Sequence, residues 1–357
     1  MTSSPDLRIL FRAAAGPRRG FGHMVRCLSL ARALGVRPLM SVRGGTHVRD
    51  TALALGADVL ADDTPRVLRF VRPDVVIIDD PIASDAKRWM RAARRLGALV
   101  VTIHDLGIGA HGADLVIDGS VTRNTPRSAG GRTLRGSAFA VLDPRVAKLR
   151  DRGRLEAAPT CASGSDRRSA PESARRAGSY ASPSRRSDDV PSRHVLIALG
   201  GGPHVELADE LAQAIVAADA YAQVRVAGGF IAKPRRVHPR ISWIRARGLA
   251  PELAKAHVAI VGGGVSLYEA AAMGVATVGV PVVRAQEATV LAFARRGAAL
   301  GVRFGAPTQT AATKALSLLN NPEHRVALSR RSRTLVDGHG ATRAAAVVIA
   351  LAEARRR

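Results

Sequence analysis

The stretch Ala259–Val283, AIVGGGVSLYEAAAMGVATVGVPVV, constrains the fold of this chain more than any other segment. It begins as a short apolar strand, Val258–Val261, and then breaks into three glycines. Ser266 is a candidate N-cap for the short helix that Leu267–Met273 predicts. The next apolar run, Val275–Val283, is typical of a buried strand. The stretch therefore predicts a strand, a glycine loop, a helix and a second strand in immediate succession.

This arrangement is suited to binding an anion. Glycines let a ligand approach the backbone closely, and the free N–H groups at a helix start point toward negative charge. An ordinary tight turn would use the same glycines, so the loop by itself leaves both interpretations open.

The N-terminal part of the chain repeats the pattern. Leu7–Phe11 predicts a strand, Arg12–Gly22 a loop, and a helix follows from about His23 to Leu34. Further strands and helices alternate after it, which favours a parallel sheet covered by helices on both faces. The remaining predicted strands of this half are Pro38–Val42, Pro73–Asp80, Ala98–Ile103 and Asp114–Ile117.

Several polar residues are expected at one edge of that sheet. Ligands of parallel α/β sheets bind at the carboxyl ends of the strands. The residues predicted at this edge are Gly22, His23, Asp79, Asp80, His104 and Asp105. For Asp79 and Asp80 the alternative is that they cap the turn or helix that follows.

The segment Asp151–Arg193 differs in composition from the rest of the chain. It is rich in Ser, Arg, Pro, Ala and Gly and has almost no large apolar residue, so it predicts a disordered linker. A second alternation of strands and helices begins at His194–Leu199, followed by the glycines 200–202. We therefore expect domains at 1–150 and 194–357, joined by a linker at 151–193, with a ligand site in the cleft between them.

The composition excludes several classes of function. The formal charge is +25, but the arginines are scattered and aromatic residues make up 3% of the chain, which argues against a nucleic-acid-binding protein. Attraction to an anionic membrane surface stays open as a prediction. No apolar run reaches about 20 residues and the N-terminus lacks signal-peptide order, so we expect a cytoplasmic protein. We also expect it to be a monomer. The two cysteines provide neither a disulfide framework nor a metal cluster.

Four motifs together resemble a known group of enzymes. They are GFGHMVRCLSLARAL at Gly20–Leu34, VLIALGGG at Val195–Gly202, GGGVSLYEAAAMGVATVGVPVVRAQ at Gly262–Gln286 and DGHGATR at Asp337–Arg343. The chain resembles the UDP-sugar hydrolases of pseudaminic acid biosynthesis and the related spore-coat polysaccharide proteins, and more distantly the GlcNAc transferase of peptidoglycan synthesis. The resemblance implies a GT-B-like α/β fold, in which two Rossmann-like parallel-sheet domains face each other across a cleft.

The resemblance also implies roles for individual residues. The C-terminal domain would bind UDP, with Glu269 on the ribose hydroxyls. His23 would be the catalytic base, with no metal and no cofactor required. The residues implied at the diphosphate are Gly263, Gly264 and Ser266, and Gly201 is implied to bind the nucleotide as well. Those implied to bind the substrate are Gly20, Gly22, Arg26, Asp105 and Gln286.

Two of these residues have a structural alternative. Ser266 and Glu269 have the spacing of a capping box, in which the glutamate bonds back to the helix start. His23 could instead be a satisfied histidine at a helix start, although a neutral imidazole is suited to act as a base near pH 7. His104 and Asp105 are secondary candidates for contacting the sugar or orienting His23.

The expected function is hydrolysis of a UDP-sugar. The first alternative is an inverting, metal-independent glycosyltransferase, and the second is a nucleotide-sugar-binding protein without catalytic activity. The chain departs from the hydrolase pattern at two places. Ala14 replaces the aspartate usual after Arg12, and Gln286 is not followed by the usual asparagine.

Overall fold

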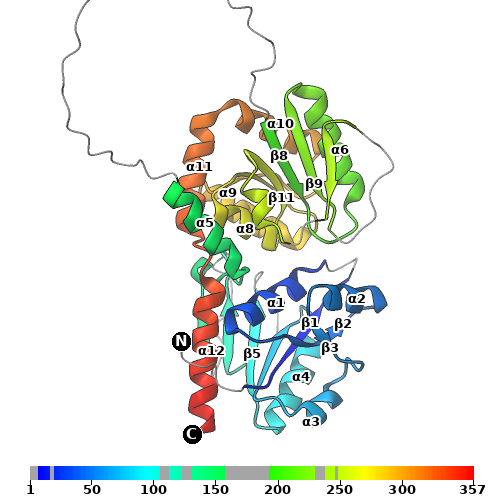
Figure 1. The fold of residues 1–357 in the computed structure, drawn as a ribbon, viewed down its shortest axis with the longest axis vertical. Helices are drawn as coiled ribbons and strands as arrows, with labels where there is room; N and C mark the ends of the chain where they lie inside the picture. The colour runs from blue at the N-terminus through cyan, green and yellow to red at the C-terminus, as the bar shows by residue number, and fades with distance from the viewer. Residues whose placement is uncertain are drawn as a thin grey trace, which may run out of the picture.

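The chain forms two parallel sheets arranged end to end along the long axis of the molecule, as the ribbon in Figure 1 shows. This computed structural model describes residues 7–16, 20–104, 112–122, 131–156, 193–229, 238–245 and 248–357, without the side chains of 152–156. Each sheet has the expected alternation of strands and helices, and every strand pair is parallel.

The N-terminal sheet has the strand order β3-β2-β1-β4-β5-β6-β7. Its strands are β1 (Ile9–Ala14), β2 (Leu39–Arg43), β3 (Asp58–Val59), β4 (Val75–Asp79), β5 (Leu99–His104), β6 (Leu115–Asp118) and β7 (Arg132–Arg135). The helices among them are α1 (Gly22–Leu34), α2 (Thr46–Ala54), α3 (Leu68–Val71) and α4 (Ala83–Arg95), with the 3-10 turns Pro65–Val67 and Ser137–Phe139.

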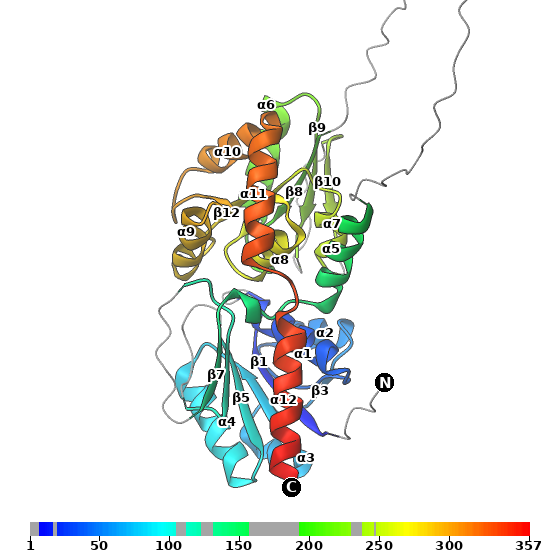
Figure 2. The same cartoon turned by 90° about the vertical axis from the view of Figure 1, so that its left-hand side faces the viewer.

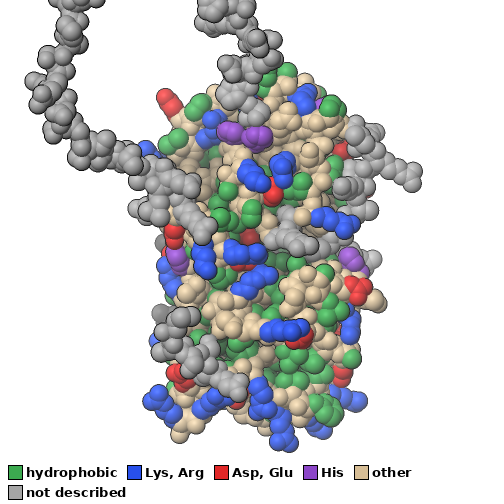
Figure 3. Space-filling view, viewed as in Figure 1, with side chains coloured by type: hydrophobic (Ala, Val, Ile, Leu, Met, Phe, Trp, Pro, Cys, Tyr) green, Lys and Arg blue, Asp and Glu red, His purple; other side chains and the backbone are tan. Residues whose placement is uncertain are grey.

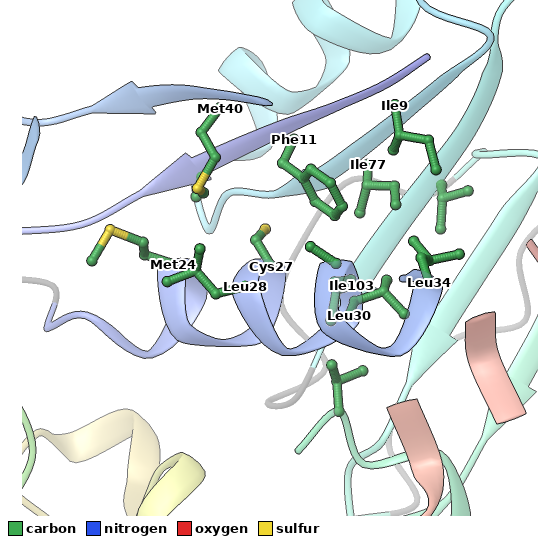
Figure 4. Close-up of a cluster of buried hydrophobic side chains, with 14 of the residues drawn as sticks. Ile9, Phe11, Met24, Cys27, Leu28, Leu30, Leu34, Met40, Ile77 and Ile103 are labelled. Atoms are coloured by element: carbon green, nitrogen blue, oxygen red, sulfur yellow. The ribbon is translucent and has the colours of Figure 1, made fainter. Parts of the chain in front are cut away.

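Side chains of β1 alternate between the two faces of this sheet, as a strand requires. Ile9 and Phe11 pack against α1, in the apolar cluster drawn in Figure 4. Leu10 packs on the opposite face with Trp89 of α4. Both faces are therefore covered, which explains why the strands are apolar throughout.

The C-terminal sheet has the order β10-β9-β8-β11-β12-β13. Its strands are β8 (Arg193–Ala198), β9 (Ala222–Ala227), β10 (Ile241–Ile244), β11 (Val258–Gly262), β12 (Ala276–Val280) and β13 (Leu300–Gly301). Its helices are α6 (Val205–Ala218), α7 (Ala250–Leu253), α8 (Val265–Met273), α9 (Glu287–Arg295), α10 (Thr308–Asn320) and α11 (Pro322–Leu335), with a 3-10 turn at Arg284–Gln286.

Two helices cross from one sheet to the other. Helix α5 (Pro144–Glu156) leaves the N-terminal sheet and packs beside α8, where Val146 joins the apolar cluster of the C-terminal half. Helix α12 (Gly340–Arg356) returns and packs along α1, as Figures 1 and 2 show. The chain segments that lead into α5 and α12 are in contact, because a Cβ on Gly340 would lie 2.2 Å from the carbonyl oxygen of Ala140. The DGHGATR motif thus forms the second crossing.

These crossings modify the expected division of the chain. Helix α12, at the C-terminal end of the chain, packs on the N-terminal domain. Helix α5, which follows the N-terminal sheet in sequence, packs on the C-terminal domain. Each helix has an apolar face that the other domain covers. Residues 151–156, expected in the linker, are the end of α5. The linker residues 157–192 lie outside the described part of the chain. The short edge strands β3, β7 and β13 were not predicted, because two to four half-buried residues give no periodic signal.

The stretch Pro322–Arg356 contains an 18-residue window with the hydropathy of a membrane span, and 44% of that window is buried. In the structure the stretch consists of two helices, α11 and α12, which pack against different domains. Its apolar residues therefore contribute to the cores of both halves.

Candidate functional site

A cavity of about 480 Å³ lies between the two sheets and is lined by both of them. In each sheet the strand order reverses beside the first strand, between β1 and β4 and between β8 and β11. Open α/β sheets bind ligands at such reversal points. The cavity is lined by the loops that leave β1, β8 and β11 there, so it lies where the sequence predicted a site.

Two helix starts face each other across this cavity. A Cβ on Gly22, at the start of α1, would lie 3.6 Å from Cγ2 of Val265, at the start of α8. Both helices exceed two turns, and their first N–H groups have no intrahelical partner. The cavity therefore lies between two sources of partial positive charge.

His23 lines the cavity and forms a hydrogen bond with a buried carboxylate. Its Nδ1 lies 2.7 Å from Oδ1 of Asp79, the last residue of β4. A terminal nitrogen of Arg26 also lies 2.8 Å from this Nδ1. Because the carboxylate can only accept, we assign the hydrogen to Nδ1, which leaves Nε2 with a lone pair. A histidine held in this way can take a proton from a hydroxyl group in the cavity.

Arg26 binds the same carboxylate from one turn further along α1. Its Nε and one terminal nitrogen donate to the two oxygens of Asp79, at 2.7 and 2.8 Å. Burial favours the neutral form of Asp79, but the charge of Arg26 and the hydrogen bonds from His23 and Arg26 prevail and hold the pKa of this carboxyl well below its usual range. Asp79 therefore stays ionised, and it neither caps a helix nor faces solvent.

This pairing bears on two expectations. Arg26 lines the cavity, but it is 4% exposed and its guanidinium is bound to Asp79, so its contact with a substrate stays a prediction. The residue that orients His23 is Asp79, which was not a secondary candidate for that role. His104 is buried beside Thr102 and does not line the cavity, and Asp105 lies outside the described residues.

Asp80 is also removed from the cavity. It accepts hydrogen bonds from Arg43 and from the backbone of Ile82, and it lies 3.8 Å from Nε of the buried Arg12. It therefore belongs to a structural ion cluster on the other side of β4.

The start of α8 differs in detail from the prediction. Gly264, not Ser266, is the N-cap, and the helix begins at Val265. Ser266 lies in the first turn and lines the cavity, and its hydroxyl has no partner among the described residues. Gly263 does not face the cavity, because its N–H donates to the carbonyl of Val280 and its Cα packs against Val290. Gly264 does line it, as expected.

Glu269 lies on the buried side of α8 and lines the cavity. It forms no capping box with Ser266, and its carboxylate has no hydrogen-bond partner among the described residues. Burial, reinforced by the charge of Asp143 and opposed by Arg145, raises the pKa of Glu269 to about 8. An unpaired acid at the wall of a cavity is suited to receive the hydroxyl groups of a ligand.

Sequence reasoning missed a polar group next to Glu269. Asp143, just before α5, accepts from Arg32 of α1 at 2.7 Å and from Arg145 at 2.7 Å. Burial opposes ionisation of Asp143, but the hydrogen bonds and charge of Arg145 lower its pKa. All three line the cavity. Their positions are set by the first crossing between the domains, which no local pattern in the sequence announces.

The remaining candidates line the cavity at its glycine loops and rim. Gln286 uses Oε1 to accept from the backbone of Val282, and its Nε2 would lie 3.4 Å from a Cβ on Gly264. Gly20, Gly22 and Gly201 also line it, as expected. His204, which the sequence analysis did not select, lines the cavity after the glycines 200–202, and burial lowers its pKa.

Among the described residues, no group of three or more His, Cys, Asp or Glu side chains is placed to hold a metal ion.

Comparison with known proteins supports the resemblance seen in the motifs. No family model matches the chain. The spore coat polysaccharide biosynthesis protein SpsG of Bacillus subtilis is 32% identical over 173 residues, which are 44% of this chain and 50% of that protein. The match thus spans about half the length of this relative.

Solved structures match along almost the whole chain. The glycosyltransferase SnogD of Streptomyces nogalater has a TM-score of 0.60 at 16% identity, covering 98% of this chain and 100% of that one. MurG of Acinetobacter baumannii has a TM-score of 0.58 at 14% identity, with 96% and 99% covered. MnaA of S. aureus, solved with UDP, has a TM-score of 0.56 at 11% identity, with 94% of each chain covered. The chain has the GT-B fold, as its sequence predicted.

Proposed function

We propose that this protein is a glycosyltransferase that uses a UDP-sugar donor and His23 as its base. The observation that carries the proposal is the His23–Asp79 pair at the wall of the cavity, opposite the start of α8. The comparisons support a nucleotide-sugar substrate, because one structural neighbour is a glycosyltransferase and another was solved with UDP.

In the proposed reaction, Nε2 of His23 takes the proton of an acceptor hydroxyl. The oxygen of that hydroxyl attacks the anomeric carbon as the bond between this carbon and the diphosphate oxygen breaks. The bonding electron pair leaves with UDP, and the sugar configuration inverts. Asp79 stabilises the imidazolium that forms, and the two salt-bridge contacts from Arg26 keep the carboxylate in place.

The leaving group gains negative charge as the bond breaks. The start of α8, with Gly264 and Ser266 on the cavity wall, offers backbone N–H groups to the diphosphate. Glu269 lies further along the same helix, where it would accept hydrogen bonds from the ribose hydroxyls. Its carboxyl group has no hydrogen-bond partner among the described residues, which supports this role.

Hydrolysis of the UDP-sugar, with water in place of the acceptor, is the second candidate. The motif Gly20-Phe21-Gly22-His23 favours it, because it resembles the hydrolase motif. The same base and the same leaving-group site would serve both reactions. Cytoplasmic location and a monomeric state remain predictions attached to either candidate.

The test is to incubate the protein with a panel of UDP-sugars and follow both UDP and the sugar by NMR. A transferase requires an acceptor for UDP release and forms a new glycoside of inverted configuration. A hydrolase releases UDP and free sugar in equal amounts without an acceptor. UDP binding with no release under any condition would refute both reactions and favour the non-catalytic binder.

A further inference from the structure

A second pocket lies at the opposite end of the N-terminal domain from the cleft. It has a volume of about 640 Å³ and contains five arginines. It lies where the chain enters β1, β4 and β5, at the amino ends of these strands, whereas His23 and Asp79 follow the carboxyl ends. The arginines are Arg8, Arg69, Arg72, Arg355 and Arg356.

The pocket is strongly positive. Asp74 is its single acidic lining residue, and it already accepts from the backbone N–H of Arg8 and from Arg356, at 2.8 and 2.9 Å. Arg355 pairs with Asp114. Arg69 and Arg72 have no partner among the described residues, so two guanidinium groups remain available to an anion.

The backbone at Arg72 is unusual for an arginine. Its φ of 44° is left-handed, and among the described residues every other backbone with a positive φ belongs to glycine. Glycine would adopt this conformation at lower cost. Arg72 therefore stands at a position where the backbone conformation favours glycine.

An exposed aromatic residue stands beside the arginines. Phe70, between Arg69 and Arg72 in sequence, is 86% exposed, and Leu96 on the pocket rim is 45% exposed. Figure 3 shows Lys and Arg side chains gathered over this lower end, where Figure 1 places α3 and the end of α12. Basic residues around a protruding aromatic side chain are typical of proteins that bind to a membrane surface.

We propose that this end of the molecule docks on an anionic phospholipid surface. The pocket would hold lipid phosphates between Arg69 and Arg72, and Phe70 would enter the interfacial region. Because the pocket and the catalytic cleft lie at opposite ends of one sheet, docking leaves the cleft open. The inference does not depend on the reaction proposed for the cleft.

Vesicle cosedimentation tests the proposal on the full chain. We expect binding to phosphatidylcholine vesicles that contain phosphatidylglycerol, little binding to pure phosphatidylcholine, and loss of binding at high salt. The double variant Arg69→Ala/Arg72→Gly should lower the partition coefficient about 30-fold, since each basic residue near such a surface contributes about a factor of five to ten. Its melting temperature should equal or exceed that of the parent, because glycine relieves the backbone at 72.

Two matched controls separate position from charge and hydrophobicity. Arg303→Ala/Arg330→Ala removes two exposed, unpaired arginines from the C-terminal domain and should leave vesicle binding within about twofold of the parent. Phe70→Ala should weaken binding about tenfold, whereas Tyr221→Ala, which removes a half-exposed aromatic elsewhere, should not.

Three results would overturn the proposal. Equal binding of the two double variants would show a non-specific charge effect. Unchanged binding of Phe70→Ala would exclude insertion. Pyrophosphate binding that depends on Arg69 and Arg72, measured by calorimetry in the absence of any vesicle binding, would assign the pocket to a soluble phosphate ligand.

Discussion

Nδ1 of His23 lies 2.7 Å from Oδ1 of Asp79, although 55 residues separate them in the chain. The carboxylate that holds the imidazole is itself held by Arg26, one turn of α1 away from the histidine. Three side chains thus form one unit at the reversal point of the N-terminal sheet. The unit fixes the tautomer of His23 and leaves its second nitrogen for chemistry.

Replacing His23 by alanine should abolish most UDP release while UDP affinity stays within a few fold. Loss of a general base typically lowers the rate by about 10²–10⁴. Rates on the true substrate and calorimetric UDP binding would measure the two effects. His324→Ala, on α11, is the control and should turn over normally. Normal turnover by the His23 variant would place the base elsewhere.

Replacing Asp79 by asparagine should lower both activity and stability. The amide no longer fixes the Nδ1–H tautomer, so the rate should fall toward that of His23→Ala, and the double variant should be little slower than either. Arg26 would be left buried without its counter-charge, at a cost of about 3 kcal/mol in the free energy of unfolding.

The exposed pair Arg37–Asp58 provides the comparison for Asp79. Asp58→Asn should change stability by less than about 0.5 kcal/mol, measured by urea unfolding. If Asp79→Asn and His23→Ala lowered the rate independently, so that their effects multiplied, the two residues would not act as one unit.

Replacing Glu269 by glutamine should weaken UDP binding about tenfold and stabilise the protein at high pH. The pKa of Glu269 is about 8 in the folded chain, above its ordinary value. The native state therefore holds an extra proton, and the associated stability is complete below about pH 4.5 and lost as pH rises through 8. The neutral glutamine removes this loss, which amounts to roughly 5 kcal/mol at pH 9 for a pKa raised from 4.5 to about 8.

Thermal unfolding at pH 5 and pH 9 measures the stability effect, and calorimetry with UDP measures the affinity. Parent and variant should melt alike at pH 5 and separate at pH 9. Glu206→Gln, in the first turn of α6, is the control. Unchanged UDP affinity in Glu269→Gln would remove the ribose assignment.

Alanine at Gly263 and at Gly264 should have opposite consequences. A Cβ at Gly263 would lie 2.7 Å from Cγ2 of Val290, so we expect a loss of about 1–3 kcal/mol in stability. A Cβ at Gly264 meets nothing closer than 3.4 Å, so folding should persist while the added methyl group on the cavity wall lowers UDP affinity. Chemical unfolding and UDP titration of both variants would check this, and a destabilised Gly264→Ala would contradict it.

Much of the fold could be predicted from the sequence because its signals are local. The apolar runs at Val75–Asp79 and Val258–Gly262 identify buried strands, and the glycines after β8 and β11 identify loops at their carboxyl ends. A parallel sheet then brings those loops to one edge whatever the details of packing. His23, Gly264 and Ser266 were placed at the cavity by this reasoning and by the motif resemblance.

The sequence was less informative about which side chains meet. Ser266 and Glu269 have the spacing of a capping box, yet α8 begins two residues earlier than expected, so the pair is not formed and Glu269 lines the cavity instead. Asp79 looked equally suited to capping and to function, and Asp143 and Arg145 carried no signal.

What the sequence determined by itself was the alternation of strands and helices, the position of the glycine loops and the presence of two sheets, since each depends on residues close together in the chain. What only the tertiary structure decided was the pairing of His23 with Asp79, the raised pKa of Glu269 and the exchange of α5 and α12 between the domains. These features depend on contacts between residues that are far apart in the chain. The charge state of a buried group is set by the groups around it in space, and so is the partner of an apolar helix face.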